Sequence, residues 1–160
     1  QGMKAQDLLA YIQPVFIDLD MNTVEPAIGA QRMDKVYAWK SMLDMGIHTS
    51  GGSDAPVVSF DAMENIYFAV TRKNISGQPQ EGWIPSEKIS VDEAVKLFTK
   101  NAAYASYTED ENGTIEVGKN ADFVVLEKNI YEIDPDEIKA TKVDMTVLGG
   151  EIVYEREVEE

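Results

Sequence analysis

Apolar and polar positions in the first two thirds of the chain follow periods that predict strands and helices in turn. Residues 12–17 (IQPVFI) and 46–54 have the pattern of short buried strands, and Pro14 suits a strand end or a bulge. Helix-period spacing follows each run, over residues 30–45 and again from Asp61 onward. Strand, helix, strand, helix is the order of a parallel β/α architecture, which we expect here.

Three predicted helices have boundary signals. Gly46 is at the C-terminal cap position of the helix over residues 30–45. The helix from Asp61 has a stripe of apolar side chains that we expect to be buried, formed by Met63, Ile66, Tyr67 and Val70. Ser90 and Glu93 form a capping box at the start of the third helix. Its apolar face is formed by Val91, Ala94, Val95, Phe98 and Ala102.

From Thr114 onward the period is that of β-strands. The β-rich runs cover residues 114–117, 122–127 and 143–154. Gly149 and Gly150 interrupt the last run and predict a hairpin turn. Asp134 predicts the cap of a short helix that has Pro135 at its first position. This part of the chain is therefore a sheet segment distinct from the β/α part.

The stretch GIHTSGGSDAPV, residues 46–57, places the carboxylate of Asp54 just after the second predicted strand. The glycines before it allow close approach of backbone and ligand, and Pro56 ends the strand. In a β/α barrel the C-terminal ends of the strands carry the chemistry. We therefore take Asp54 as the candidate functional residue, facing a cleft. The alternative is a structural role, as an Asx-turn residue or a helix cap.

Residues 74–89 are rich in Gly, Pro and polar residues and predict a long loop, which in a compact domain is usually a lid, a binding loop or disordered. Trp83 within it either forms the wall of a pocket or pins the loop. Residues 18–29 and 108–119 partly imitate calcium loops, but each lacks the bidentate acid at position twelve. We interpret the second stretch as a turn that leads into a strand.

The composition of the chain argues against several kinds of partner and site. The 160 residues include 14 basic and 29 acidic side chains, for a net charge of -15, and the lack of a Lys and Arg surplus argues against nucleic acid as a partner. No apolar run approaches a membrane span and no signal peptide is visible, so we expect no membrane partner and a cytoplasmic location. Cysteine is absent, which excludes a Cys-zinc site and a thiol nucleophile.

Five motifs follow one another along the chain. They are GSDAPV at 52–57, AVTR at 69–72, GWIP at 82–85, NAAYA at 101–105 and GTIEVGKNADFVVLE at 113–127. In this order they resemble the C-terminal part of the metal-dependent amidohydrolase superfamily, in its amidohydrolase-3, or YtcJ-like, branch. The resemblance implies the C-terminal portion of a (β/α)8 TIM barrel in residues 3–107. It implies strands of a composite β-sandwich in residues 108–160.

The resemblance also implies a role for Asp54. In the family, the aspartate after the last barrel strand contacts the metal or its bound water, takes a proton from that water and passes it to the leaving nitrogen. The implied activity is hydrolysis of amide or other non-peptide carbon–nitrogen bonds in small molecules. The implied cofactor is a divalent metal, with zinc as the first choice, and the loop with Trp83 is expected near the substrate.

The chain departs from the family in its metal ligands. The family uses an early His-x-His and two later histidines, whereas this chain has only His48, which is outside any matched ligand position. Because Asp54 alone cannot complete a catalytic site, we expect a C-terminal fragment of a longer enzyme, without metal or activity by itself. Open barrel edges would then favour self-association. The alternative function is an autonomous acidic binding module without catalysis.

Overall fold

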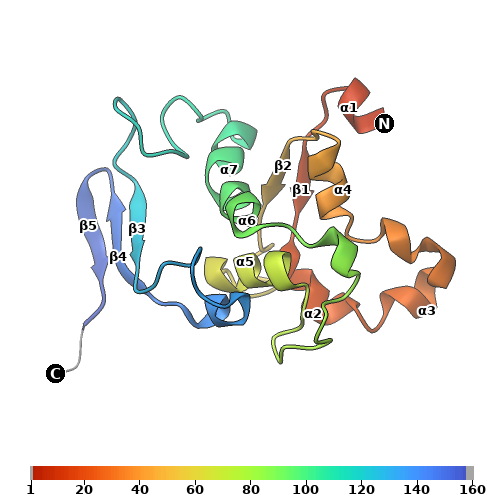
Figure 1. Cartoon of the computed structure of the whole chain (residues 1–160). Coiled ribbons are helices and arrows are strands. Elements are labelled where there is room, and N and C mark those ends of the chain that lie inside the picture. The colour runs from red at the N-terminus through yellow and green to blue at the C-terminus, as the bar shows by residue number, and fades with distance from the viewer. Residues whose placement is uncertain (1, 158–160) are drawn as a thin grey trace.

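The computed structural model describes residues 2–157 and has two regions (Figure 1). The first region combines helices with a two-stranded parallel sheet, and the second is a three-stranded antiparallel sheet. In Figure 1 the antiparallel sheet stands at the left, and helices α5, α6 and α7 lie between it and the parallel sheet. Among the described residues, no helix is both long and apolar enough to cross a membrane.

The parallel sheet consists of β1 (Ala10–Ile12) and β2 (Thr49–Gly51). Their parallel pairing confirms the predicted β/α order. The strand predicted over residues 12–17 is wrong, because β1 ends where that range begins and Pro14 opens the 3-10 turn η1 (Pro14–Phe16). Proline fixes its own φ and has no backbone N–H to donate, so it suits the first position of a helical turn better than a strand interior.

Short helical pieces connect the two strands. After η1 come α2 (Ile17–Asp20), α3 (Val24–Ile28), η2 (Ala30–Lys35) and α4 (Trp39–Asp44), and the short α1 (Gly2–Ala5) precedes β1. The single helix predicted over residues 30–45 is wrong, because the chain breaks between η2 and α4. Tyr37, at the break, has a φ of +50°, its hydroxyl donates to Asp20, and its carbonyl accepts from Arg72. These contacts hold Tyr37 out of a helical conformation.

Helix α5 (Ala62–Thr71) is central to the first region. Asp61 caps it as predicted, because its carboxylate accepts hydrogen bonds from the backbone N–H groups of Met63 and Glu64. The buried side chains belong to Met63, Asn65, Ile66, Tyr67, Phe68, Ala69 and Thr71. Met63, Ile66 and Tyr67 of the predicted stripe are among them, but Val70 is only half-buried. The other buried residues lie outside the stripe because η1, α6 and η4 all pack against this helix.

Helix α6 (Val91–Phe98) begins at the predicted capping box. The Ser90 hydroxyl accepts from the Glu93 N–H, and the Glu93 carboxylate accepts from the Ser90 N–H. The prediction of one helix through residue 102 is wrong, because the chain leaves the helical conformation at Thr99, with φ −125° and ψ −100°. Helix α7 (Lys100–Ala105) follows in a new direction, and both helices contact β2.

The antiparallel sheet has the order β3 (Phe123–Leu126), β4 (Val143–Leu148), β5 (Glu151–Glu155). Gly149 and Gly150 form the predicted turn between β4 and β5, both with positive φ.

The strand predicted over residues 114–117 is wrong, because this stretch is a loop. The Lys119 ammonium donates to the Glu109 carbonyl and the Thr114 hydroxyl, which holds the segment in a closed turn instead of an extended strand.

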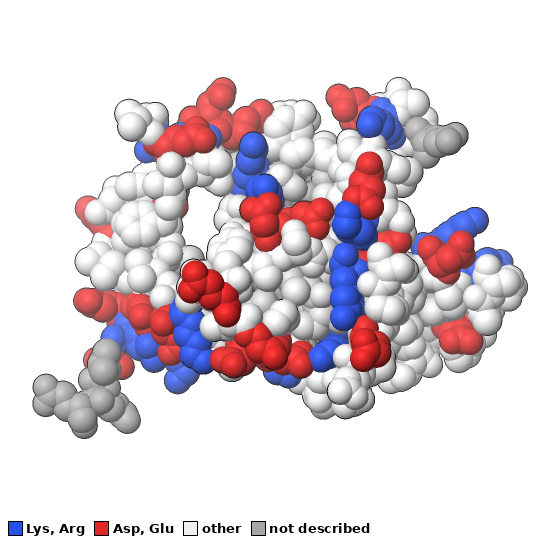
Figure 2. All heavy atoms as spheres, in the orientation of Figure 1, with Lys and Arg blue, Asp and Glu red and all other residues white. Residues whose placement is uncertain are grey.

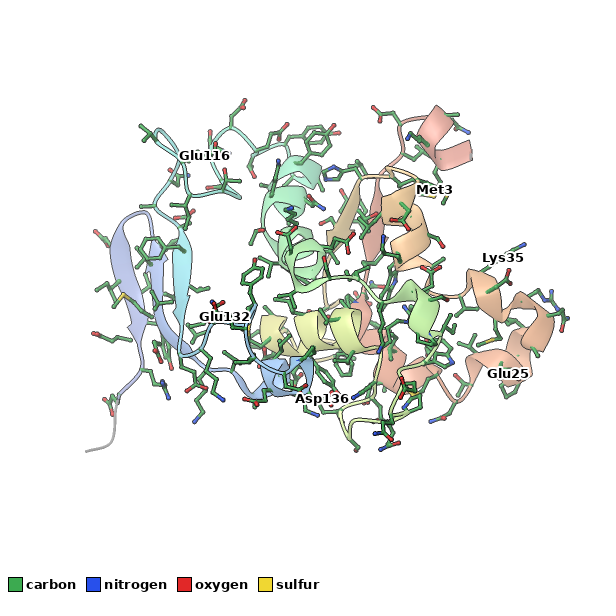
Figure 3. All side chains as sticks on the ribbon, in the orientation of Figure 1. Met3, Glu25, Lys35, Glu116, Glu132 and Asp136 are labelled. Atoms are coloured by element: carbon green, nitrogen blue, oxygen red, sulfur yellow. The ribbon has the colours of Figure 1, made fainter. Side chains whose placement is uncertain are left out.

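Two further 3-10 turns complete the chain, η3 (Pro85–Glu87) and η4 (Pro135–Ala140). Asp134 caps η4 as predicted, through a hydrogen bond from the N–H of Asp136. Asp136, labelled in Figure 3, also accepts from the ammonium of Lys73 at 2.7 Å, just beyond the end of α5. The η4 turn is therefore part of the first region's packing, although it lies between β3 and β4 in the sequence.

Candidate functional site

Asp54 lies three residues after β2, beyond the C-terminal end of the parallel sheet. Its φ of +61° is in the left-handed region, which non-glycine residues occupy mainly at turns and functional sites. Its backbone carbonyl accepts from the Val57 N–H at 3.0 Å, so the turn is made by the main chain and is not an Asx-turn. The side chain is exposed and forms no hydrogen bond with a described residue. The carboxylate is therefore open to a ligand.

The strand that leads to Asp54 is fixed by close packing on α6. A Cβ atom at Gly51 would lie 2.7 Å from the ring of Phe98, well inside van der Waals contact. Only glycine lets the end of β2 approach α6 this closely. Gly51 thus places the strand end that precedes the candidate carboxylate, whereas a Cβ atom at Gly52 would meet nothing within 4 Å.

His48 lies at the opposite end of β2 from Asp54. Its Nε2 is 3.0 Å from the carbonyl oxygen of Asn101, and its ring packs on that of Tyr104 with centroids 4.1 Å apart. In return, the Asn101 amide donates to the Thr49 carbonyl at 2.9 Å. These reciprocal contacts tie β2 to α7, so His48 has a structural environment and not one directed at Asp54.

Residues 2–157 do not form a complete metal site. Within this range no three His, Asp or Glu side chains come together in a way that could hold a metal ion. A catalytic metal usually takes at least three protein ligands. Of the donor set that the resemblance implies, the described residues include Asp54 alone, and its role as a ligand stays a prediction.

Trp83 lies at the neck of the loop that the sequence predicted over residues 74–89. Its backbone N–H donates to the backbone carbonyl of Arg72 at 2.7 Å, and its backbone carbonyl accepts from the Arg72 Nε at 2.6 Å. Its ring is 5.5 Å from the ring of Tyr37. The contacts therefore close both ends of the loop against each other, and a role for Trp83 toward a substrate stays a prediction.

Arg72 is completely buried in this neck. Its guanidinium carbon lies 4.7 Å from the centre of the Trp39 ring and 5.7 Å from that of Trp83, which are cation–π distances. Burial lowers the pKa of the guanidinium, and the carboxylate of Glu87 opposes that effect. Glu87 is itself buried, and it accepts from the backbone N–H of Ser41 at 2.9 Å. A charged group is thus held inside the first region by aromatic rings and carbonyls.

A pocket of about 220 Å³ lies between α2, α5 and the segment that follows Asp54. Val58, Phe68 and Ile75 are among its apolar lining residues. Sequence reasoning missed this pocket, although one signal was present. Ile75 is the only aliphatic residue in the polar stretch KNISGQPQE, residues 73–81, and an isolated apolar side chain in such a loop suggests a contact.

A larger cavity, of about 680 Å³, separates α6 and α7 from β3. Figure 2 shows an opening between these parts of the surface. Its lining includes Phe98, Ile115 and Phe123 but none of Asp54, His48 and Trp83. This larger hollow is therefore not beside the candidate carboxylate.

The architecture agrees with the comparison to known proteins, whereas the role of Asp54 stays a prediction. Residues 1–154 match the family described as "Amidohydrolase family". The chain belongs to this family. It is 38% identical over 145 residues to the amidohydrolase YtcJ of Bacillus subtilis (strain 168). The match covers 91% of this chain and 27% of YtcJ. The predicted amidohydrolase-3, YtcJ-like branch is thereby confirmed.

Two further relatives extend the comparison. The N-substituted formamide deformylase of Arthrobacter pascens is 35% identical over 122 residues, which cover 76% of this chain and 22% of that protein. The solved structure of an uncharacterized metal-dependent hydrolase from Pyrococcus furiosus superposes with a TM-score of 0.60 at 25% identity, over 74% of this chain and 23% of that one. The chain thus spans about a quarter of the length of these relatives.

Membership of this family assigns each of the two regions to a part of the family fold. The parallel strands and their helices are a C-terminal portion of a TIM-barrel amidohydrolase fold, and the antiparallel strands are those that follow the barrel. This confirms the predicted fold class. The predicted boundary between the two parts, at residue 107, stays a prediction.

Proposed function

We propose that this chain is the C-terminal part of a metal-dependent hydrolase that cleaves amide or other non-peptide carbon–nitrogen bonds in small molecules. Family membership supports a hydrolase, and one relative is named for removing the formyl group from N-substituted formamides, which are amides. The same membership favours this function over an autonomous acidic binding module. We expect the chain to be inactive by itself, because the described residues do not complete a metal site.

The observation that carries the proposal is the position of Asp54. Its carboxylate follows the last residue of β2 by three positions and is open to solvent at the end of the sheet where barrel enzymes bind their substrates. In the proposed reaction Asp54 accepts a proton from the attacking water and delivers it to the leaving nitrogen. A divalent metal, with zinc as our first choice, would supply a more acidic water, and its remaining ligands would come from outside this chain.

The test is the substitution Asp54→Asn in the full-length enzyme that contains this chain. Asparagine keeps the shape of the side chain but cannot accept the proton, so we expect turnover to fall on the order of 10²–10⁴-fold with an unchanged melting temperature. Asp110→Asn is the matched control, because Asp110 is also exposed and lies in a loop that does not follow a barrel strand. Turnover near the original level in Asp54→Asn would remove this residue from the mechanism.

A further inference from the structure

The pocket between α2, α5 and the segment after Asp54 adjoins the proposed reaction site. The hydrogen bond from the Val57 N–H to the Asp54 carbonyl closes a turn, and a turn of this kind keeps its end Cα atoms within about 7 Å. Val58, which lines the pocket, is one residue further along. Its Cα therefore lies within about 11 Å of the Cα of Asp54. The lining of the pocket thus begins at a distance from Asp54 that a small substrate can span.

One wall of the pocket is held in place from two sides. The Ile75 N–H donates to a carboxylate oxygen of Asp18 at 2.7 Å, and the Ile75 carbonyl accepts from the ammonium of Lys139 at 2.6 Å. The loop that carries Ile75 is also closed at its neck by Arg72 and Trp83. The Ile75 side chain is thus presented by a fixed backbone, and a fixed wall can discriminate between ligands by size.

The lining of the pocket is mostly apolar. Val15, Leu19, Val58, Phe68 and Ile75 contribute to it. An apolar cavity of about 150 Å³ holds a benzene molecule, so the 220 Å³ here is sufficient for a six-membered ring with a small substituent.

The rest of the lining is polar, with Ser59 and the two carboxylates of Asp18 and Glu64. Among the described residues neither forms an ion pair, and the Glu64 carboxylate accepts no hydrogen bond. The ammonium of Lys139 is nearby at the Ile75 carbonyl, but it does not line the pocket, whereas both carboxylates do. The potential inside the pocket is therefore negative, which favours a cation and repels an anion. The carboxylates therefore add a charge preference to the size limit that the apolar lining sets.

We propose that this pocket is a substrate subsite that accepts an apolar, ring-sized substituent, prefers a cationic group on it to an anionic one, and has Ile75 as its specificity-determining residue. The inference rests on the proposed function, because it assigns the pocket to the same substrate whose carbon–nitrogen bond lies at Asp54. It predicts amides with a ring-sized apolar group, neutral or bearing an amine, as the substrate class.

The test measures binding to the 160-residue chain by methyl NMR, with neither metal nor turnover involved. The probes share one ring and differ in charge: cyclohexylammonium, cyclohexanol and cyclohexanecarboxylate. We expect cyclohexylammonium to bind saturably and to shift the methyl signals of Ile75 and Val58. Cyclohexanol should bind less tightly, and cyclohexanecarboxylate at least tenfold less tightly than the ammonium.

Two pairs of substitutions show whether the probes bind in this pocket and whether its charge selects among them. Ile75→Trp fills the pocket and should abolish binding, whereas Ile152→Trp, at an exposed position on β5, should leave it unchanged. Glu64→Gln should reduce the ratio of the affinities for cyclohexylammonium and cyclohexanecarboxylate about threefold. Glu116→Gln removes the same charge from an exposed position elsewhere, so it should not change this ratio. Amide spectra that keep their dispersion show that each variant is folded.

The proposal is overturned if no probe binds saturably or if binding survives Ile75→Trp. It is equally overturned if the shifted methyl groups are those of Ile115 and Val124, because these residues line the larger cavity at β3. The outcome is independent of the reaction. If the probes bind at Ile75 but Asp54→Asn keeps normal turnover, the proposed function alone is refuted. If Asp54→Asn loses turnover but no probe binds, the subsite alone is refuted.

Discussion

The two regions of the chain differ in where their apolar side chains lie. In the first region α5 is covered on several sides, and Tyr67 and Ala69 are completely buried. In the antiparallel sheet every residue of β5 is exposed, including Ile152 at 58% and Tyr154 at 48%. The first region therefore has an apolar core of its own, whereas the fully exposed β5 has apolar surface typical of a contact with something else.

Charged groups differ between the regions in the same way. Arg72 is buried among aromatic rings and donates to the carbonyls of Tyr37 and Trp83. Arg156, at the end of the sheet, pairs with Asp144 near the surface. An arginine is thus buried in one region and close to solvent in the other. A matched pair of substitutions measures how much each arginine contributes to the free energy of unfolding.

The largest effect should come from Arg72→Ala. It leaves the Trp83 carbonyl without its donor, takes one of two donors from the Tyr37 carbonyl, and opens a cavity between tryptophan rings. We therefore expect the free energy of unfolding to fall by about 3 kcal/mol. Arg156→Ala removes two ion pairs near the surface, with Asp144 and Glu127, and should cost about 1 kcal/mol. Urea denaturation followed by tryptophan fluorescence measures both. Equal losses for the two variants would contradict the contrast between the regions.

The next prediction concerns the exposed sheet. Strands β1 and β2 have only three residues each, and short edges resist pairing with another chain, although association through these barrel edges stays a prediction. The longer β5 is the more suitable contact. We expect concentration-dependent self-association by sedimentation velocity, and Ile152→Lys should weaken it about tenfold, because a charge there must be desolvated. Ile115→Lys, in an exposed loop, is the control. A monomer at all concentrations would contradict the prediction.

Local signals predicted those parts of the fold that depend on neighbouring residues. Asp61 and the box of Ser90 with Glu93 begin their helices where expected, and Gly149 with Gly150 forms the expected turn. These features follow from hydrogen bonds within a few residues, so a single sequence contains the information.

Side-chain contacts decided the features that the sequence did not predict. Tyr37 breaks the expected helix because it binds Asp20 and Arg72, which are 17 and 35 positions away. The loop at residues 114–117 was missed for another reason, because Lys119 holds it through side-chain contacts that leave no periodic pattern. Such partners cannot be identified from periodicity.

The candidate site shows the same limit. Asp54 was found from its motif, whereas the pocket that adjoins it needs Ile75, which is 21 positions away and is placed by Asp18 and Lys139.

A smaller effect should come from the contact between β2 and α7. Asn101→Ala removes the donor to the Thr49 carbonyl, which is inside the first region, so we expect a loss of about 1–2 kcal/mol in the free energy of unfolding. Asn129→Ala removes an exposed hydrogen bond from the Tyr131 N–H, and its cost should stay below about 0.5 kcal/mol. Thermal unfolding followed by circular dichroism compares the two. A larger loss for Asn129→Ala would reverse the proposed ranking of the regions.

The smallest effect should be a pH dependence that arises at Tyr37. Burial and the hydrogen bond to Asp20 raise the pKa of its phenol above the ordinary value near 10. Above pH 10 the unfolded chain therefore loses this proton while the folded chain retains it, and the stability that Tyr37 contributes is lost as the pH rises through the folded-state pKa.

Tyr37→Phe removes this titration, so the difference in unfolding free energy between the original chain and the variant should shrink between pH 9 and pH 11. Arg72, whose buried guanidinium has a lowered pKa and would act in the opposite direction, is present in both proteins, and its contribution largely cancels in the difference. Urea denaturation at the two pH values gives the comparison. A difference that stays constant would mean that the phenol ionises equally in both states, and that the neck of the loop is more open to solvent than its contacts indicate.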